Sequence, residues 1–451
     1  MTSPSLPASG EQVSEKVIND TIHGSFHVDD VRSQLLKTPE FNKLSHIKQL
    51  GLAHLVFPGA HHTRFEHSLG VSHVGGLMSD SLKLDADEKQ LVQVAAMLHD
   101  VGHGPYSHTL EHILHERGGI DHMSVTEGII TGDHDVLRAG EQSVFSDRDR
   151  VPDILERHGI EPEQISSLIR GADAMGTERN LFWNEGQDVF SDDDHTLANV
   201  VHGPVDCDQI DYLLRDAHFT GVKHGIIDYR HLIHNLHRHA GNIAIDESGL
   251  PALEGMLTAR ALMYSAVYFH RVTRITEMML SSAVERMDVE NSDPIDMQRM
   301  VDAEIWQVLD EQGEYQRDII RRIKYRQLFK VALTRRRSDL NEEQVKILLE
   351  IATDTQRRRA LEDEIASRAK VPEGYVCIDV PSVKLLLSEP RMADVDIRVR
   401  GEDGRYRWFK EHTPMADALR TRQVSQAALY VTTLSSATEA VAKIAERLLF
   451  A

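Results

Sequence analysis

Residues 95–112 read AAMLHDVGHGPYSHTLEH and join the end of an apolar segment to a stretch rich in histidine and glycine. The apolar residues before His99 and Asp100 recur at helical spacing, whereas two glycines and a proline after them interrupt the helix. A carboxylate beside imidazoles suits a borderline divalent cation. We therefore expect a metal site where this helix ends.

A second histidine cluster lies upstream, in HHTRFEHSLG at residues 61–70. His67 offers another imidazole to the same cation. Arg64 precedes it by three residues and so shares its helix face. There the guanidinium can hold a phosphate oxygen beside the metal in bidentate fashion, and a plain surface arginine is the competing interpretation.

A fourth ligand is expected from DCDQIDYLLRDAHF, where Asp208, Tyr212 and Asp216 repeat every four residues and share one helix face. Taken alone, the segment also fits an ordinary amphipathic helix with an ion pair between Asp211 and Arg215. The two histidine clusters upstream favour Asp208 as a ligand.

The residues after Asp100 are suited to proton transfer. His103 and His108 fall in the interrupted stretch, and imidazole titrates near neutrality. Glu111 is able to orient one of these rings. His112 and His115 are equally well explained as structural histidines.

A polar and aromatic stripe recurs in MLTARALMYSAVYFHR, residues 256–271. Arg260, Tyr264 and Tyr268 lie four residues apart, so they share a helix face that could line a nucleotide pocket. Helix packing explains the same pattern.

The composition limits the class of protein. The 451 residues carry 71 acidic and 50 basic side chains, a formal charge of −21, which argues against the broad basic surface of nucleic-acid binders. Only two cysteines occur, Cys207 and Cys377, which fits a reducing compartment. The first fifteen residues lack an apolar segment, and no stretch is apolar enough to span a membrane. We expect a cytoplasmic protein.

Most of the chain has helical spacing, but GYVCIDV and VDIRVRGEDGRYRWFKE, beyond about Gly374, alternate as strands of a small sheet would. Residues 172–197 lose the helical period and predict a surface loop. Nine Lys or Arg residues in 317–337 predict a basic helix, either solvated or bound to polyanions or partner subunits. The predicted divisions are a flexible start at 1–15, a core at 16–335 and a C-terminal lobe at 336–451.

With these residues in place, the chain resembles the HD-domain deoxynucleoside triphosphate (dNTP) triphosphohydrolases, most closely the catalytic core of the sterile-alpha-motif-and-HD-domain dNTPase. The resemblance runs from about Lys16 to residue 430. It rests on VINDTIHG, VFPGAHHTRFEHSLGVSH, AAMLHDVGHGPYSH and DCDQIDYLLRDAHFTG. It implies a mostly α fold, with an HD-domain helical core and a smaller mixed α/β C-terminal lobe.

The resemblance also implies an activity, the hydrolysis of dNTPs to a deoxynucleoside and inorganic triphosphate by attack at the α-phosphorus. One divalent ion, iron, zinc, manganese or magnesium, would be bound by His67, His99, Asp100 and Asp208, and further magnesium can accompany the triphosphate. His108 would be the general acid, supported by His103, Glu111 and His122. Substrate would contact Gln49, Leu50, Arg64, Tyr212, Asp216, Arg260 and Tyr268.

Two departures from the family stand out. Gln209 replaces a phosphate-binding lysine, so one positive charge is absent near the metal aspartate, and catalysis should survive this loss. Lys37 and Ser45 replace the residues that read guanine in nucleotide-activated members. We expect either no nucleotide activator or one of different selectivity. The resemblance further implies a homo-oligomer, a tetramer or hexamer.

Two rival functions stay open. The same scaffold could serve a phosphohydrolase or phosphodiesterase acting on another nucleotide, such as an alarmone, a dinucleotide or an NTP. A nucleotide or nucleic-acid sensor without turnover is supported only by the basic run at 317–337. Product analysis separates these functions from dNTP triphosphohydrolysis, because free triphosphate favours hydrolysis at the α-phosphorus.

Overall fold

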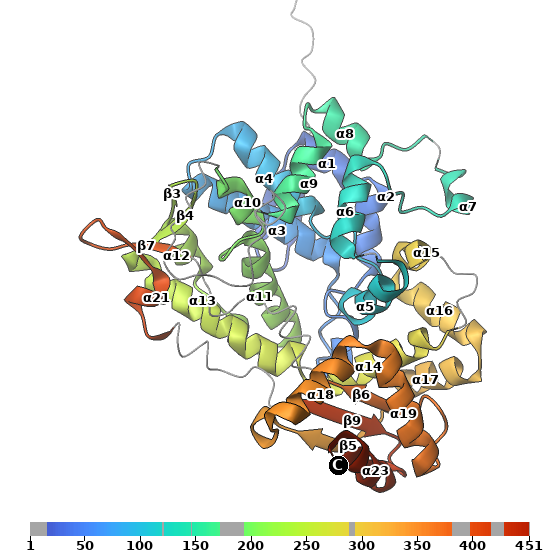
Figure 1. The fold of residues 1–451 in the computed structure, drawn as a ribbon. Coiled ribbons are helices and arrows are strands. Elements are labelled where there is room, and N and C mark those ends of the chain that lie inside the picture. The colour runs from blue at the N-terminus through green and yellow to red at the C-terminus, as the bar shows by residue number, and fades with distance from the viewer. Residues whose placement is uncertain are drawn as a thin grey trace, which may run out of the picture.

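The computed structural model describes residues 16–119, 121–145, 147–171, 194–287, 294–380, 397–415 and 428–450. Over these residues the chain is mostly helical with three small sheets (Figure 1), which confirms the predicted fold class. The start predicted as flexible, and most of the surface loop predicted at 172–197, lie outside the described residues.

Three helices build the core around the histidine clusters. α3 (Arg64–Ser81) packs against both α4 (Ala86–Leu98) and α11 (Cys207–Thr220). Gly70 permits the close approach of α11, because a Cβ atom there would lie 2.0 Å from Oδ1 of Asp211. The apolar residues in the second half of α4 are fully buried, so the end of this helix is fixed inside the core.

A hairpin, further helices and single turns complete this part of the molecule. β1 (Lys16–Asp20) and β2 (Gly24–Val28) form an antiparallel hairpin that leads into the core. The surrounding helices are α1 (Asp30–Leu35), α2 (Pro39–Asn42), α5 (Ser107–Gly118), α6 (His122–Thr131), α7 (Ala139–Gln142), α8 (Val151–Arg157), α9 (Pro162–Arg170), α10 (Thr196–Val201), α12 (Tyr229–His234) and α13 (Leu250–Met263). Single turns form η1 (Lys43–His46), η2 (Gly51–Leu55), η4 (Lys223–Gly225), η5 (Glu247–Gly249) and the π-turn η6 (Tyr264–Tyr268).

The helices from α14 onward, except α21, lie below this core in Figure 1. Leu110 of α5 shares a buried cluster with Met279, Ile305 and Ile319 of three later helices. Those three helices are α14 (Arg271–Glu285), α16 (Asp302–Gln312) and α17 (Glu314–Lys324), and α15 (Pro294–Arg299) lies between α14 and α16 in the chain. The lobe adds η7 (Arg337–Asp339), α18 (Glu342–Thr353), α19 (Thr355–Ala369) and α23 (Thr438–Phe450), and α21 (Phe409–His412) lies nearer the core.

The strands predicted beyond Gly374 belong to two different sheets. β6 (Val376–Asp379) joins β9 (Leu429–Thr433) and β5 (Lys330–Arg335) in the order β5-β9-β6, with both pairings antiparallel. β7 (Arg398–Arg400) and β8 (Tyr406–Trp408) instead extend the hairpin of β3 (Leu236–His239) and β4 (Asn242–Asp246). Strand pairing depends on distant partners, so local alternation does not distinguish the two sheets.

The basic helix predicted at 317–337 is shorter than expected. α17 ends at Lys324, and the later part of the basic run forms β5, whose first residue is Lys330. The run's charges gave it a helical appearance, but pairing with β9 determines the structure of its second half. The prediction of one continuous helix is therefore wrong.

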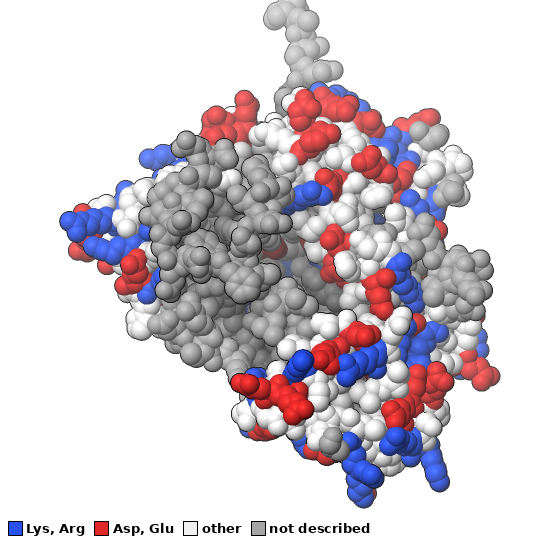
Figure 2. Space-filling model, in the orientation of Figure 1, with Lys and Arg blue, Asp and Glu red and all other residues white. Residues whose placement is uncertain are grey.

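Acidic and basic side chains are interspersed on the described part of the face shown in Figure 2. No broad basic surface is seen on that part of the face. No helix among the described residues is both long and apolar enough to pass through a bilayer.

Candidate metal centre and substrate pocket

Side chains from two helices and the end of a third converge at the predicted metal site. Possible ligand atoms of His67, His99 and Asp100 all lie within 4.8 Å of one another. His67 comes from α3, while His99 caps the C-terminus of α4 and Asp100 follows it. His67 is 1% exposed and Asp100 is 5% exposed, so the cluster is shielded from solvent.

The histidine nitrogens are oriented as a cation requires. Nδ1 of His99 donates to the carbonyl of Ala96 at 2.8 Å, which leaves Nε2 as the nitrogen with a lone pair. That Nε2 atom is buried and has no hydrogen-bond partner among the described residues. A buried acceptor without a donor is costly unless a cation occupies the space beside it. The donor set of imidazole and carboxylate therefore fits a divalent metal.

Asp208 lies at the same point. Its Oδ1 atom is 2.9 Å from Nε2 of His67 and 3.8 Å from Nε2 of His99. Burial disfavours its charge, but the hydrogen bond and the positive charge of His67 outweigh burial and lower the pKa of Asp208. The structure thus brings together all four residues predicted as ligands.

Asp211 holds the imidazole of His67 from behind. Its Oδ2 atom is 2.8 Å from Nδ1 of His67, and its Oδ1 atom is 2.7 Å from Nε2 of His23. Both oxygens also accept from Arg215, at 2.8 and 2.9 Å. The predicted ion pair is present, and the same carboxylate fixes the tautomer and orientation of a metal-ligating ring. Sequence reasoning missed this second role.

Asp100 lies beside one guanidinium group and two imidazoles. Nη1 of Arg64 lies 2.5 Å from its Oδ2, and Nε2 of His103 lies 3.2 Å from its Oδ1. Burial disfavours the carboxylate charge, but Arg64, His99 and His103 hold the pKa of Asp100 well below its usual range. Asp100 therefore stays ionised, as a metal ligand must.

The pKa values of two imidazoles predicted for proton transfer are shifted in opposite directions. His103 and His122 stack with ring centroids 4.3 Å apart and an interplanar angle of 11°. Burial, with the positive charge of Arg64, holds the pKa of His103 well below its usual value. Burial also disfavours charge on His122, but Nδ1 of His122 bonds to Glu111 and the pKa of His122 is raised. His122 is therefore the better proton donor of the two.

The side chain of His108, predicted as the general acid, lies outside the described residues. Its backbone is placed in the first turn of α5, three residues before Glu111. The structure therefore does not test its role.

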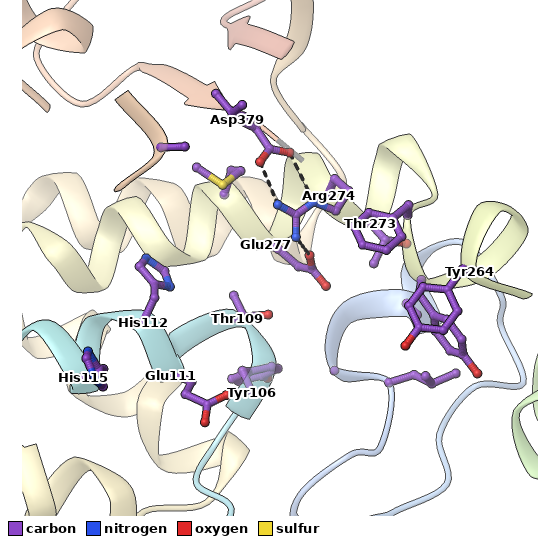
Figure 3. A pocket seen from close by; sticks show the side chains of 18 of the residues that line it. Tyr106, Thr109, Glu111, His112, His115, Tyr264, Thr273, Arg274, Glu277 and Asp379 are labelled. Atoms are coloured by element: carbon purple, nitrogen blue, oxygen red, sulfur yellow. Dashed lines mark hydrogen bonds and ion pairs between the residues drawn. The ribbon is translucent and has the colours of Figure 1, made fainter. Parts of the chain in front are cut away.

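A cavity of about 1310 Å³ opens beside the cluster. It runs from the core to the C-terminal lobe, between α5 on one side and α14 on another (Figure 3). Arg64 and Glu111 border it close to the metal cluster. Of the residues predicted to contact substrate, those that line it are Gln49, Leu50, Arg64, Tyr212, Asp216 and Tyr268.

Asp216 organises the end of the cavity predicted to hold the sugar. The hydroxyl of Tyr268 donates to its Oδ2 at 2.6 Å, and Nε2 of His62 lies 2.8 Å from its Oδ1. The π-turn η6 interrupts the helix at Tyr264–Tyr268, and such turns occur frequently at functional sites. Tyr212 meets Tyr268 edge-on, with ring centroids 6.2 Å apart.

Arg260 and Gln209 lie deeper than the other predicted contacts. Arg260 is 2% exposed and does not border the cavity, and its Nη1 donates to Oε1 of Gln209 at 3.1 Å. Nε2 of Gln209 donates to Oδ2 of Asp206 at 2.9 Å. Gln209 is thus engaged in a buried polar network and does not project toward substrate as a lysine could.

The far wall of the cavity is built by the lobe. Figure 3 shows Arg274 of α14 between Asp379 of β6 and Glu277. Its Nη2 is 2.7 Å from Asp379 and its Nη1 is 2.9 Å from Glu277. No local sequence signal marks the pair of Arg274 and Asp379, because the two residues are 105 positions apart.

Comparisons with known proteins place the chain in a family. Residues 64–173 match the HD domain family, and residues 227–450 match the HD associated region. Uncharacterized protein MJ1154 of Methanocaldococcus jannaschii is 30% identical over 420 residues, which cover 91% of this chain and 77% of that protein. Human deoxynucleoside triphosphate triphosphohydrolase SAMHD1 is 29% identical over 292 residues, 60% of this chain and 45% of that protein. Uncharacterized protein YwfO of Bacillus subtilis is 34% identical, and the chain spans 57% of its length.

Two solved structures share the fold. A hypothetical protein from Aquifex aeolicus has a TM-score of 0.64 at 28% identity, covering 96% of this chain and 100% of that one. A phosphohydrolase from Bacteroides thetaiotaomicron has a TM-score of 0.67 at 22% identity, covering 93% and 99%. The matches confirm the resemblance inferred from the sequence motifs. The chain belongs to the HD-domain phosphohydrolase family.

Proposed function

We propose that the protein hydrolyses dNTPs to a deoxynucleoside and inorganic triphosphate. The observation that carries this proposal is the position of Arg64, which contacts Asp100 of the metal cluster and also borders the large cavity. A triphosphate bound there has its α-phosphate near the cluster and its sugar near Tyr268. The similarity to proteins named as dNTP triphosphohydrolases supports the same substrate class.

His67, His99, Asp100 and Asp208 would hold the divalent ion. When bound, such an ion polarises a phosphoryl oxygen and makes water a stronger nucleophile at neutral pH. Asp211 keeps the lone pair of His67 aimed at the ion through the bond to its Nδ1 atom.

The chain's own residues would complete the reaction. Water attacks the α-phosphorus in line, and the bond from phosphorus to the 5′-oxygen breaks. Arg64 stabilises negative charge on the phosphate oxygens. His108 donates a proton to the departing 5′-oxygen, with His103, His122 and Glu111 in support. Arg260 adds positive charge from behind the cavity wall.

Tyr268 and Asp216 would select the sugar. The hydrogen bond between them fixes the Tyr268 ring, which would crowd a 2′-hydroxyl group. Asp216 and Gln49 would bond to the 3′-hydroxyl. Oε1 of Gln49 is buried and lacks a partner among the described residues, so it is available as an acceptor.

The test is to incubate metal-replete protein with each dNTP and each NTP in ¹⁸O-labelled water, without GTP. Hydrolysis at the α-phosphorus puts the label in triphosphate and leaves the deoxynucleoside unlabelled. His67→Ala should abolish turnover, while the exposed His234→Gln should not change it. Pyrophosphate as product, or turnover of another nucleotide with dNTPs untouched, would reject the proposal.

The expected homo-oligomer and the cytoplasmic location stay predictions. Light scattering coupled to size exclusion determines the number of subunits. We propose a tetramer or hexamer that needs no guanine nucleotide, so activity that appears only after GTP is added contradicts this part.

A further inference from the structure

A segment outside the matched HD domain grips the histidine loop of that domain. The loop runs from Val101 to Tyr106, between Asp100 and α5. The gripping segment is residues 298–306, from the end of α15 into α16, and it lies in the HD associated region. We call these residues, together with Lys43, the clamp.

Side chains of the clamp bind backbone carbonyl groups of the loop. Nε2 of Gln298 donates to the carbonyl of Gly102, and Nζ of Lys43 donates to the carbonyl of His103 at 3.2 Å. The same ammonium group donates to the carbonyl of Gln298 at 2.6 Å. Lys43 is 9% exposed, so its Nζ atom is held by two carbonyl groups away from water.

Asp302 joins this loop to a second one. Its Oδ1 atom accepts from the backbone N–H of Tyr106 at 3.0 Å, and its Oδ2 atom accepts from the N–H of Lys48 at 2.9 Å. Lys48 precedes Gln49, which is predicted to contact substrate. One buried carboxylate therefore fixes two loops that contribute residues to the wall of the cavity.

The loop needs such support. The backbone of Tyr106 has a φ of 47°, in the left-handed region that residues other than glycine seldom adopt. The hydroxyl group of Tyr106 accepts a hydrogen bond from Nε1 of Trp306. Gly104 lies so close to the clamp that a Cβ atom there would be 2.5 Å from Oε1 of Gln298. A strained conformation persists only where the surroundings determine it.

We propose that Lys43, Gln298 and Asp302 are positioning residues, which hold the loop so that His103 reaches Asp100 and stacks on His122. The inference rests on the proposed function for its kinetic consequence. It assigns the HD associated region a part in building the active site of the HD domain. Within the described part of the chain, the hydrogen bonds of these three side chains go to backbone atoms and not to the proposed metal ligands.

The test compares Asp302→Asn with Asp310→Asn, an exposed aspartate on the same helix. The amide has the shape of the carboxylate, but it can accept from only one of the two N–H groups. We expect amide exchange in peptides 47–50 and 101–106 to rise at least about tenfold, with α3 unchanged. We expect kcat to fall about 10- to 100-fold, with KM and bound metal unchanged. Asp310→Asn should match the wild type in every measurement.

Lys43→Met, which removes two hydrogen bonds, and Gln298→Met, which removes one, repeat the test. These two variants decide the matter if Asp302→Asn does not fold. Wild-type exchange in 101–106 for these variants overturns the proposal. So does a fall in kcat that follows loss of metal, or exchange that rises equally along α3. Amide exchange is measured without substrate, so it tests the clamp even if the protein does not hydrolyse dNTPs. A wild-type protein that is inactive on dNTPs would reject only the proposed function.

Discussion

Oδ2 of Asp211 lies 2.8 Å from Nδ1 of His67, and the same carboxylate binds Arg215 through both oxygens. Arg215 is completely buried and also bonds to Asp20 at 2.9 Å. The orientation of a metal ligand is thus tied to a buried ion pair that links α11 to the N-terminal hairpin.

Replacing Asp211 with Asn should lower metal affinity about 10- to 100-fold, because the amide orients the His67 ring less well. The variant should also unfold at a lower temperature, since Arg215 loses a charged partner. Asp20→Asn is the matched control, because it weakens the same arginine without touching His67. We expect it to lower the melting temperature and to leave metal affinity, measured by competition with a chelating dye, unchanged. Equal loss of affinity in both variants would show that Asp211 acts only through stability.

Metal binding should release about one proton. Burial disfavours a charged imidazole, but the bonds to Asp208 and Asp211 outweigh it and raise the pKa of His67 to about 10 in the metal-free protein. An imidazole that binds a metal must be neutral, so below pH 10 the ion displaces this proton. Affinity should then rise about tenfold per pH unit between pH 6 and 9. Calorimetric titration in two buffers of different ionisation enthalpy counts the protons, and a count of zero would contradict the prediction.

Gly102 should not tolerate a side chain. A Cβ atom there would lie 2.4 Å from both the carbonyl of His122 and the N–H nitrogen of Thr126. Gly102→Ala should therefore cost about 1–3 kcal/mol in the free energy of unfolding and displace the histidine loop, with loss of kcat. Gly255→Ala, in the exposed face of α13 with open space around it, should instead stabilise the protein by about 0.5–1 kcal/mol. Urea unfolding measures both changes.

Glu285 should make the joint between core and lobe sensitive to acid. It binds His112 at 3.0 Å, Arg358 at 2.7 Å and Arg359 at 3.1 Å. Burial disfavours its charge, but these partners lower the pKa of Glu285 to about 2. A carboxyl group whose pKa is lower in the folded state stabilises the fold at pH values above its unfolded pKa of about 4.5. This stabilisation is lost as the pH falls toward 2.

At pH 7, Glu285→Gln should therefore be less stable than the wild type by about 3 kcal/mol. The difference should shrink steadily below pH 4.5. Denaturant midpoints at pH 7, 5, 4 and 3 measure it, with the exposed Glu156→Gln as a control that should show no change. A difference that is constant with pH would mean that Glu285 is not ionised in the fold.

The sequence predicted the parts of the site that consist of typical metal-ligating residue types, histidine and aspartate. His67, His99, Asp100 and Asp208 were predicted from histidine clusters and a helical repeat, and the structure brings all four to one point. Whether they bind metal stays a prediction. Asp211 was missed in this role because its spacing from Arg215 is the same as that of any surface ion pair, and burial was not visible.

The remaining features depend on partners far away in the chain. The bond between Asp302 and Tyr106 spans 196 residues, and nothing in the residues around Asp302 indicates it. The same holds for β5, which was predicted as helix because its pairing with β9 cannot be read from local charge. Long-range pairing overrides local preference most strongly in strands.

The return of β7 and β8 to the hairpin of β3 and β4 limits how the protein can be shortened. Cutting the chain after residue 335 would remove both strands and leave β4, with its buried Ile243 and Ile245, as an open edge. Unpaired apolar edges recruit strands from other molecules. A segment of the C-terminal part of the chain therefore completes a sheet of the preceding part, so the C-terminal part cannot be removed without exposing that sheet's edge.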